Sequence, residues 1–166
     1  MINIALIEPE IPQNTGNIGR LCVSSDSELH LVKPLGFSLS DKYMKRAGLD
    51  YWQHLSWDVH NSFDDFIESF ADRRLVFTCS CNGISIHDYE FQPGDTIVFG
   101  KESVGLPQWM FDKYHDNVVT IPMIGKTRSL NLANSVGIVM YEALRQLDKK
   151  GLKPFGEKSN IRQGIL

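Results

Sequence analysis

The fold of this chain is decided by one stretch, Ile121-Pro122-Met123-Ile124-Gly125-Lys126-Thr127-Arg128-Ser129-Leu130-Asn131-Leu132-Ala133-Asn134. A strand pattern stops at Pro122, a basic loop follows, and a helix begins near Asn131. Serine and asparagine are residue types that cap helices and offer hydroxyl and amide groups to a ligand. Alone, such a stretch is most typical of a well-capped structural helix. The apolar residues that follow recur at helical spacing and predict a core-facing helix: Leu132, Val136, Val139, Met140, Ala143, Leu144 and Leu147.

The composition is that of an ordinary globular protein with room for one domain. At 166 residues the chain can bury one substantial core. We expect a single domain over residues 1–152 and a peripheral tail over residues 153–166, because the tail lacks periodicity. No apolar run approaches the ~20 residues that span a bilayer, and the N-terminus lacks a signal-peptide pattern, which together predict a cytoplasmic protein without a membrane segment.

Charge and metal-binding residue types argue against two classes of protein. The formal net charge of −3 argues against a protein that coats nucleic acid through a bulk positive field. The three cysteines cannot all pair within one chain and predict reduced, mostly buried thiols. Neither they nor the histidines have metal-ligand spacing, so we expect no metal. Local basic clusters remain: Lys42, Lys45 and Arg46; Lys126 and Arg128; and Lys149, Lys150 and Lys153.

Strand and helix patterns alternate along the chain. Strands are predicted over residues 2–7, 29–32, 75–79, 96–99 and 118–121. Helices are predicted after a cap within residues 14–17, over residues 41–47, from Asn61 or Ser62 to about residue 70, after Pro107, and after Asn131. Residues 49–57 fit either a strand or a packed loop. The alternation predicts an α/β fold, with a mostly parallel sheet and helices on both of its faces.

Polar loops follow several of the predicted strands. Parallel sheets place their binding sites at the carboxyl ends of the strands, where residues 8–12, 78–83 and 100–107 lie in this chain. In the last of these loops glycines flank Glu102, a pattern typical of a tight binding turn because glycine lets backbone approach a ligand closely. There is no Gly-x-Gly-x-x-Gly after the first strand and no P-loop motif, so a dinucleotide or P-loop site is unsupported. Spacing alone predicts that Arg20 is a surface arginine.

Three segments carry a resemblance to a known family: Asn14-Thr15-Gly16-Asn17-Ile18-Gly19-Arg20, Phe99-Gly100-Lys101-Glu102-Ser103-Val104-Gly105-Leu106-Pro107, and the stretch over residues 121–134. Together, and in this order, they resemble the motifs of the SPOUT-superfamily RNA 2′-O-methyltransferases. Residues 8–17, 35–37 and 46–51 resemble the small TrmL (YibK) branch, and the resemblance fades only after about Leu152. It implies a deep C-terminal trefoil knot, an exception to the rule against knotted chains. It also implies S-adenosylmethionine as cofactor and a homodimer in which the partner subunit completes each active site.

The resemblance implies roles for particular residues. Arg20 matches the catalytic arginine, Asn14 would position Arg20 or the ribose, and Glu102, Ser129 and Asn131 would order the pocket. The implied reaction is 2′-O-methylation of the wobble nucleotide, position 34, a cytidine or modified uridine, in leucine tRNAs. The implied tRNA contacts are Arg20, Arg46, Lys126 and Arg128. The implied cofactor contacts are Thr78, Gly100, Glu102, Ile121, Met123, Ser129 and Leu130.

Three alternatives stay open from the sequence. The same chemistry could act at another tRNA site or on ribosomal RNA, although the chain lacks the extra RNA-binding extension that many relatives carry. A catalytically idle knotted module that binds RNA is disfavoured by the intact set of polar residues. A nucleotide-binding oxidoreductase of doubly wound fold fits the alternation of strands and helices but lacks the glycine fingerprint.

Overall fold

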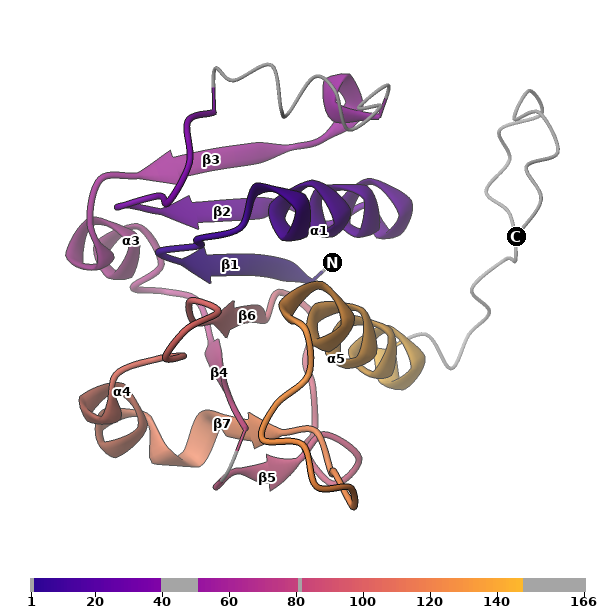
Figure 1. Cartoon of the computed structure of the whole chain (residues 1–166). Helices are drawn as coiled ribbons and strands as arrows, with labels where there is room; N and C mark the ends of the chain where they lie inside the picture. Colours follow the sequence, from indigo (N-terminus) through magenta and orange to yellow (C-terminus); the bar gives the residue numbers. More distant parts are fainter. Residues whose placement is uncertain (1, 40–50, 81, 148–166) are drawn as a thin grey trace, which may run out of the picture.

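The protein folds around one parallel β-sheet with helices on both faces (Figure 1). The computed structural model describes residues 2–39, 51–80 and 82–147. Within these ranges seven strands pair in the order β3-β2-β1-β6-β4-β7-β5, and every neighbouring pair is parallel. The carboxyl ends of the strands therefore share one edge of the sheet. The strands are β1 (Asn3–Ile7), β2 (Leu29–Val32), β3 (Trp57–His60), β4 (Leu75–Cys79), β5 (Ile84–Ser85), β6 (Thr96–Phe99) and β7 (Val118–Thr120).

In the part of the chain that the structure describes, two helices cover each face of the sheet. One face packs against α1 (Pro12–Ser25) and α5 (Leu132–Leu147), which lie against each other, and the other packs against α3 (Phe63–Ser69) and α4 (Gln108–Lys113) (Figure 1). Two short 3-10 helices, η1 (Trp52–His54) and η2 (His115–Asn117), complete the described elements. The predicted α/β class, with a mostly parallel sheet covered on both sides, is confirmed. The trefoil knot that the resemblance implies stays a prediction.

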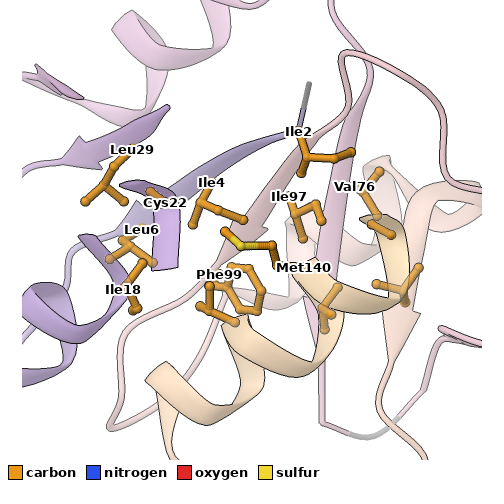
Figure 2. Packing of buried hydrophobic residues seen from close by; sticks show 14 of the residues in the cluster. Ile2, Ile4, Leu6, Ile18, Cys22, Leu29, Val76, Ile97, Phe99 and Met140 are labelled. Carbon is orange, nitrogen blue, oxygen red and sulfur yellow. The ribbon is translucent and has the colours of Figure 1, made fainter. Parts of the chain in front are cut away.

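The side chains of β1 divide between the two layers of core. Ile4 and Leu6 pack in the cluster that includes α1 and α5, whereas Ala5 and Ile7 pack in the cluster that includes α3 and α4. All of β1 is buried, as its unbroken apolar run predicts for a strand covered on both faces. Figure 2 shows Met140 of α5 reaching toward the strand residues on its face of the sheet.

The apolar stripe of α5 and most strand positions agree with the sequence pattern. Val136, Val139, Met140 and Ala143 are buried. Burial raises the pKa of the Cys22 thiol to about 12, so this cysteine is a protonated, inert core residue, as predicted. Residues 49–57, left open between strand and loop, contain η1 and the start of β3. The predicted helix over residues 41–47 and the domain boundary at residue 152 lie outside the described residues.

One predicted helix start was wrong, and one short strand was not predicted. Helix α1 begins at Pro12 rather than after a cap within residues 14–17, and its N-cap residue, Ile11, makes no side-chain capping bond. The capping groups come from elsewhere in the chain, as the site shows below. The two-residue strand β5 (Ile84–Ser85) was not predicted, because so short an edge strand has no periodicity to detect.

A pair of histidines is buried between the sheet and α3. The Nε2 of His60 lies 3.3 Å from the Nδ1 of His30, and the rings of both pack edge-on against Phe70. Burial, followed by the positive field of His60, lowers the pKa of His30 from its usual 6.5 to about 4. Glu28 and Asp58 oppose this shift, and Arg73 adds to it.

We predict that the protein loses stability on acidification between pH 6.5 and 4. The folded state holds His30 neutral while the unfolded chain takes up a proton, so stability is complete above pH 6.5 and falls toward pH 4. The expected loss from this group is about 3 kcal/mol of unfolding free energy. Urea titrations at stepped pH values measure it. The loss should shrink in His30→Phe and persist in His87→Gln, which changes an exposed histidine; an unchanged slope in His30→Phe would contradict the assignment.

Candidate active site

Four loops at the carboxyl edge of the sheet enclose a cavity of about 250 Å³. They follow β1, β4, β6 and β7, and the first turns of α1 and α5 close the remaining sides. Parallel pairing brings the four loops to one place although more than a hundred residues separate the first from the last. The cavity is lined by every residue predicted to contact the cofactor: Thr78, Gly100, Glu102, Ile121, Met123, Ser129 and Leu130.

Glu102 supplies the cap that α1 lacks. Its carboxylate accepts hydrogen bonds from the backbone N–H groups of Glu10 and Ile11, at 2.8 and 3.3 Å, and from the Asn14 side-chain amide at 2.9 Å. A carboxylate at this position also faces the positive end of the helix dipole. Pro12 at the first turn has no N–H to satisfy, which explains why the helix begins there.

The same hydrogen-bond chain continues to α5. The Asn131 Nδ2 donates to the Asn14 Oδ1 at 3.0 Å, while the Asn131 Oδ1 accepts from the backbone N–H groups of Ala133 and Asn134 and so caps α5. Glu102, Asn14 and Asn131 therefore link the loop after β6 to the starts of both helices. The Asn14 side chain thus hydrogen-bonds to Glu102 and Asn131, and its expected role of positioning Arg20 or the ribose stays a prediction.

The loop after β6 folds back on itself as a tight turn. Gly105 donates its backbone N–H to the Lys101 carbonyl at 2.8 Å and has a positive φ of 73°, a conformation that glycine adopts without strain. A Cβ atom on Gly100 would lie 2.2 Å from the Gly105 carbonyl carbon, so the two glycines pack backbone on backbone. The glycines on either side of Glu102 thus set where its carboxylate points.

Two further contacts fasten this turn to the loop after β1. The Ser103 backbone N–H and hydroxyl both donate to the Glu10 carboxylate, each at 2.9 Å. The Lys101 Nζ lies 2.7 Å from a Glu8 carboxylate oxygen, a contact that raises the pKa of the lysine and balances its positive charge. Lys101 lines the cavity with its ammonium paired to Glu8.

The cavity has apolar walls and a polar rim. Sequence reasoning missed the wall residues, including Phe99, Val119 and Val139, because buried residues in strands and helices are typical of any core. Their position at or near the carboxyl ends of β6 and β7 is the signal that could have found Phe99 and Val119. On the rim the Thr78 hydroxyl donates to the Val98 carbonyl at 3.0 Å and keeps its oxygen lone pairs available as acceptors.

Three of the four predicted RNA-binding residues lie outside the cavity. Lys126 and Arg128 are exposed in the loop between β7 and α5. Arg20 is exposed on α1, six residues beyond Asn14, which lines the cavity, and its guanidinium lies over the Tyr51 ring. Arg46 lies outside the described residues. In residues 2–39, 51–80 and 82–147, no group of histidine, cysteine or acidic side chains could hold a metal ion, and no helix is long and apolar enough to cross a membrane.

A cavity enclosed by loops at the carboxyl edge of a parallel sheet is the arrangement of ligand-binding α/β enzymes. Comparison with known proteins gives the class of enzyme. The chain belongs to the SpoU rRNA methylase family, whose profile matches residues 1–141, and it is a methyltransferase.

Relatives and solved structures agree with this assignment. A tRNA (cytidine(34)-2′-O)-methyltransferase from Methylovorus glucosotrophus is 47% identical over 153 residues, which cover 91% of this chain and 99% of the relative. A structure solved to explain 2-OH methylation of C/U34 on tRNA is 43% identical with a TM-score of 0.84, over 89% of this chain and 96% of the other. The SpoU methyltransferase AviRb from Streptomyces viridochromogenes, solved in complex with AdoMet, shares the fold at 24% identity and a TM-score of 0.77, over 87% of this chain and 57% of AviRb.

Proposed function

We propose that this protein transfers a methyl group from S-adenosylmethionine to the ribose 2′-hydroxyl of nucleotide 34, the wobble position, of tRNA. Leucine tRNAs, with cytidine or a modified uridine at this position, are the proposed substrates. The similarity to a tRNA (cytidine(34)-2′-O)-methyltransferase extends over nearly the full length of that relative, which supports the same reaction here. The proposed location is the cytoplasm.

The observation that carries the proposal is the shared cavity at the carboxyl edge of the sheet. Residues from α1 and from the carboxyl ends of β4, β6 and β7, assigned to one site from the sequence motifs, line the same space. A structural helix start would need only the cap formed by Asn131. It would not need the turn around Glu102 or an enclosed space beside it.

The cavity fits the adenosyl part of S-adenosylmethionine. Its volume of about 250 Å³ is near the lower end of the ~300–1,000 Å³ typical of small-molecule sites. Phe99, Ile121 and Leu130 offer apolar surface for a flat base, while the Thr78 hydroxyl and the polar rim offer partners for the sugar. Bound there, the cofactor would supply an electrophilic methyl group on its sulfonium sulfur.

Arg20 is the residue we assign to the ribose. A 2′-hydroxyl is a poor nucleophile at neutral pH and must lose its proton as it attacks. An arginine side chain stays protonated in proteins, so its contribution is to orient the ribose or an adjacent phosphate and to stabilise developing negative charge. Glu102, Asn14 and Asn131 hold the pocket in shape, and Ser129 lies at its rim.

A homodimer would bring Arg20 of one protomer to the cavity of the other. Arg20 does not line the cavity of its own chain, and its guanidinium lies outside that space. Ile138 and Tyr141 on α5 are 42% and 49% exposed, and this apolar surface suits contact with a second copy. We propose that Arg20 of one protomer serves the cavity of its partner. Such a pairing would also double the basic surface available to tRNA.

Methyl transfer from labelled S-adenosylmethionine to tRNA lacking the modification tests the proposed function. Nucleoside mapping should place the label as a 2′-O-methyl group at position 34 of leucine tRNAs. Label at another position, or on ribosomal RNA, would keep the chemistry and change the substrate. Absence of label on tRNA and ribosomal RNA despite tight cofactor binding would favour the idle RNA-binding module.

Neutralising Lys126 and Arg128 is expected to weaken tRNA binding and its dependence on salt. Each phosphate contact in a single-stranded segment contributes about 0.7 to the slope of log K against log salt, so Lys126→Gln with Arg128→Gln should lower the slope by about 1.4. Fluorescence anisotropy at several salt concentrations measures the slope. Lys113→Gln, which removes an exposed charge at the far end of α4, is the matched control. A slope equal to that of the unaltered protein would remove both residues from the tRNA contact.

A further inference from the structure

Tyr51 contacts α1 at two points along one helical turn. Its hydroxyl donates to the Gly16 carbonyl at 2.6 Å, and its ring lies under the Arg20 guanidinium, whose central carbon is 4.6 Å from the ring centre. Gly16 and Arg20 are four residues apart and share one face of the helix. The Gly16 carbonyl is also the one to which helix geometry directs the Arg20 backbone N–H. The Tyr51 side chain therefore lies along one turn of α1. Its hydroxyl contacts the Gly16 carbonyl, and its ring contacts the Arg20 side chain.

The segment that carries Tyr51 is held tightly against the same helix. A Cβ atom on Gly19 would lie 2.8 Å from the Trp52 ring and 3.1 Å from the Leu55 side chain, so only glycine allows this approach. Trp52 also packs against Trp57, with ring centres 5.5 Å apart, and Leu55 is buried. The position of Tyr51 beside Arg20 is thus fixed by its neighbours as well as by its own hydroxyl.

The contact with the Tyr51 ring restricts the conformations of the Arg20 side chain, which the proposed reaction needs. A free arginine on a helix surface samples many rotamers. The face of an aromatic ring attracts a guanidinium and restricts it to rotamers that keep the two planes in contact. The N–H groups point outward in the guanidinium plane and stay available to a ribose or phosphate oxygen. Among the described residues no carboxylate forms an ion pair with Arg20, so the tyrosine is the partner that orients it.

We propose that Tyr51 is the positioning residue for Arg20, acting through its ring face rather than its hydroxyl. The inference rests on the proposed function, in which Arg20 contacts the ribose during methyl transfer. Tyr51 itself touches neither cofactor nor substrate in this role. Its removal should slow the chemical step and leave the binding of S-adenosylmethionine unchanged.

The test compares two variants at Tyr51. Tyr51→Phe keeps the ring and removes the hydroxyl, so kcat should stay within about 3-fold of the unaltered protein. Tyr51→Leu removes the ring and should lower kcat by about 10-fold or more, with an unchanged KM for S-adenosylmethionine, because transition-state contacts are lost without ground-state ones. Single-turnover assays with saturating cofactor give kcat, and titration of cofactor gives KM and Kd.

A control separates positioning from general stability. Met110→Ala removes a buried side chain of α4 on the opposite face of the sheet, away from Tyr51 and Arg20, and it should lower Tm while kcat is retained. All variants are assayed well below their measured Tm. If Tyr51→Leu retains kcat, or if Met110→Ala loses kcat in proportion to Tm as Tyr51→Leu does, Tyr51 is a structural residue. If the unaltered protein transfers no methyl group, the proposed function fails and this inference fails with it.

Discussion

Arg20→Ala is expected to lower methyl transfer to tRNA by at least about 100-fold, while the fold and the binding of S-adenosylmethionine remain. Losing a positioned group that stabilises charge in the transition state costs about 10²–10³ in rate. Structural damage should be slight, because Arg20 is exposed, lies outside the cavity and contacts the Tyr51 ring. Single-turnover methylation, thermal unfolding and cofactor titration measure the three quantities.

Two further variants test whether the loss of rate is specific to the Arg20 guanidinium. Arg20→Lys keeps the positive charge but loses the planar fork of N–H donors, so it should recover only part of the rate. Arg73→Ala removes another arginine stacked on an aromatic ring, with its central carbon 5.1 Å from the ring centre of Phe70, and should leave the rate unchanged. Loss of cofactor binding together with activity in Arg20→Ala would assign a structural role to Arg20.

Local sequence patterns predicted the elements whose structure depends on residues close together in the chain. The unbroken apolar run of β1 indicated a strand covered on both faces, and the stripe on α5 indicated which side of that helix is buried. Asn131 was recognised as a capping residue because its side chain acts within its own helix. In these cases the atoms that decide the structure are neighbours in the sequence, so spacing and residue type carry the information.

Contacts between distant segments could not be predicted in the same way. The start of α1 was misplaced because its capping carboxylate, Glu102, is 92 residues away from Glu10 along the chain. Spacing alone likewise indicated only a surface position for Arg20, which is correct, and gave no sign of Tyr51 beneath it. The residues of the cavity were grouped through resemblance to a family, and the parallel sheet then brought their four loops together.

Gly100→Ala is expected to lower both the stability of the protein and its affinity for S-adenosylmethionine. The added Cβ would meet the Gly105 carbonyl carbon at 2.2 Å and the Leu106 nitrogen at 2.4 Å. Both are backbone atoms that no rotamer change can move, so the turn itself must open. Overpacking of this kind costs about 1–3 kcal/mol, and we expect the upper part of that range. Urea unfolding measures the loss.

The affinity of Gly100→Ala for S-adenosylmethionine should fall for a separate reason, because the turn also positions Glu102. Opening it displaces Glu102, whose carboxylate holds the backbone N–H groups at the start of α1 and, through Asn14, the cap of α5. Because these helix starts line the cavity, we expect cofactor affinity to fall by at least about 10-fold. Gly125→Ala is the matched control, since a Cβ there meets no atom within 4 Å and should change neither quantity. Normal cofactor affinity in a destabilised Gly100→Ala protein would show that the turn supports the fold without shaping the cavity.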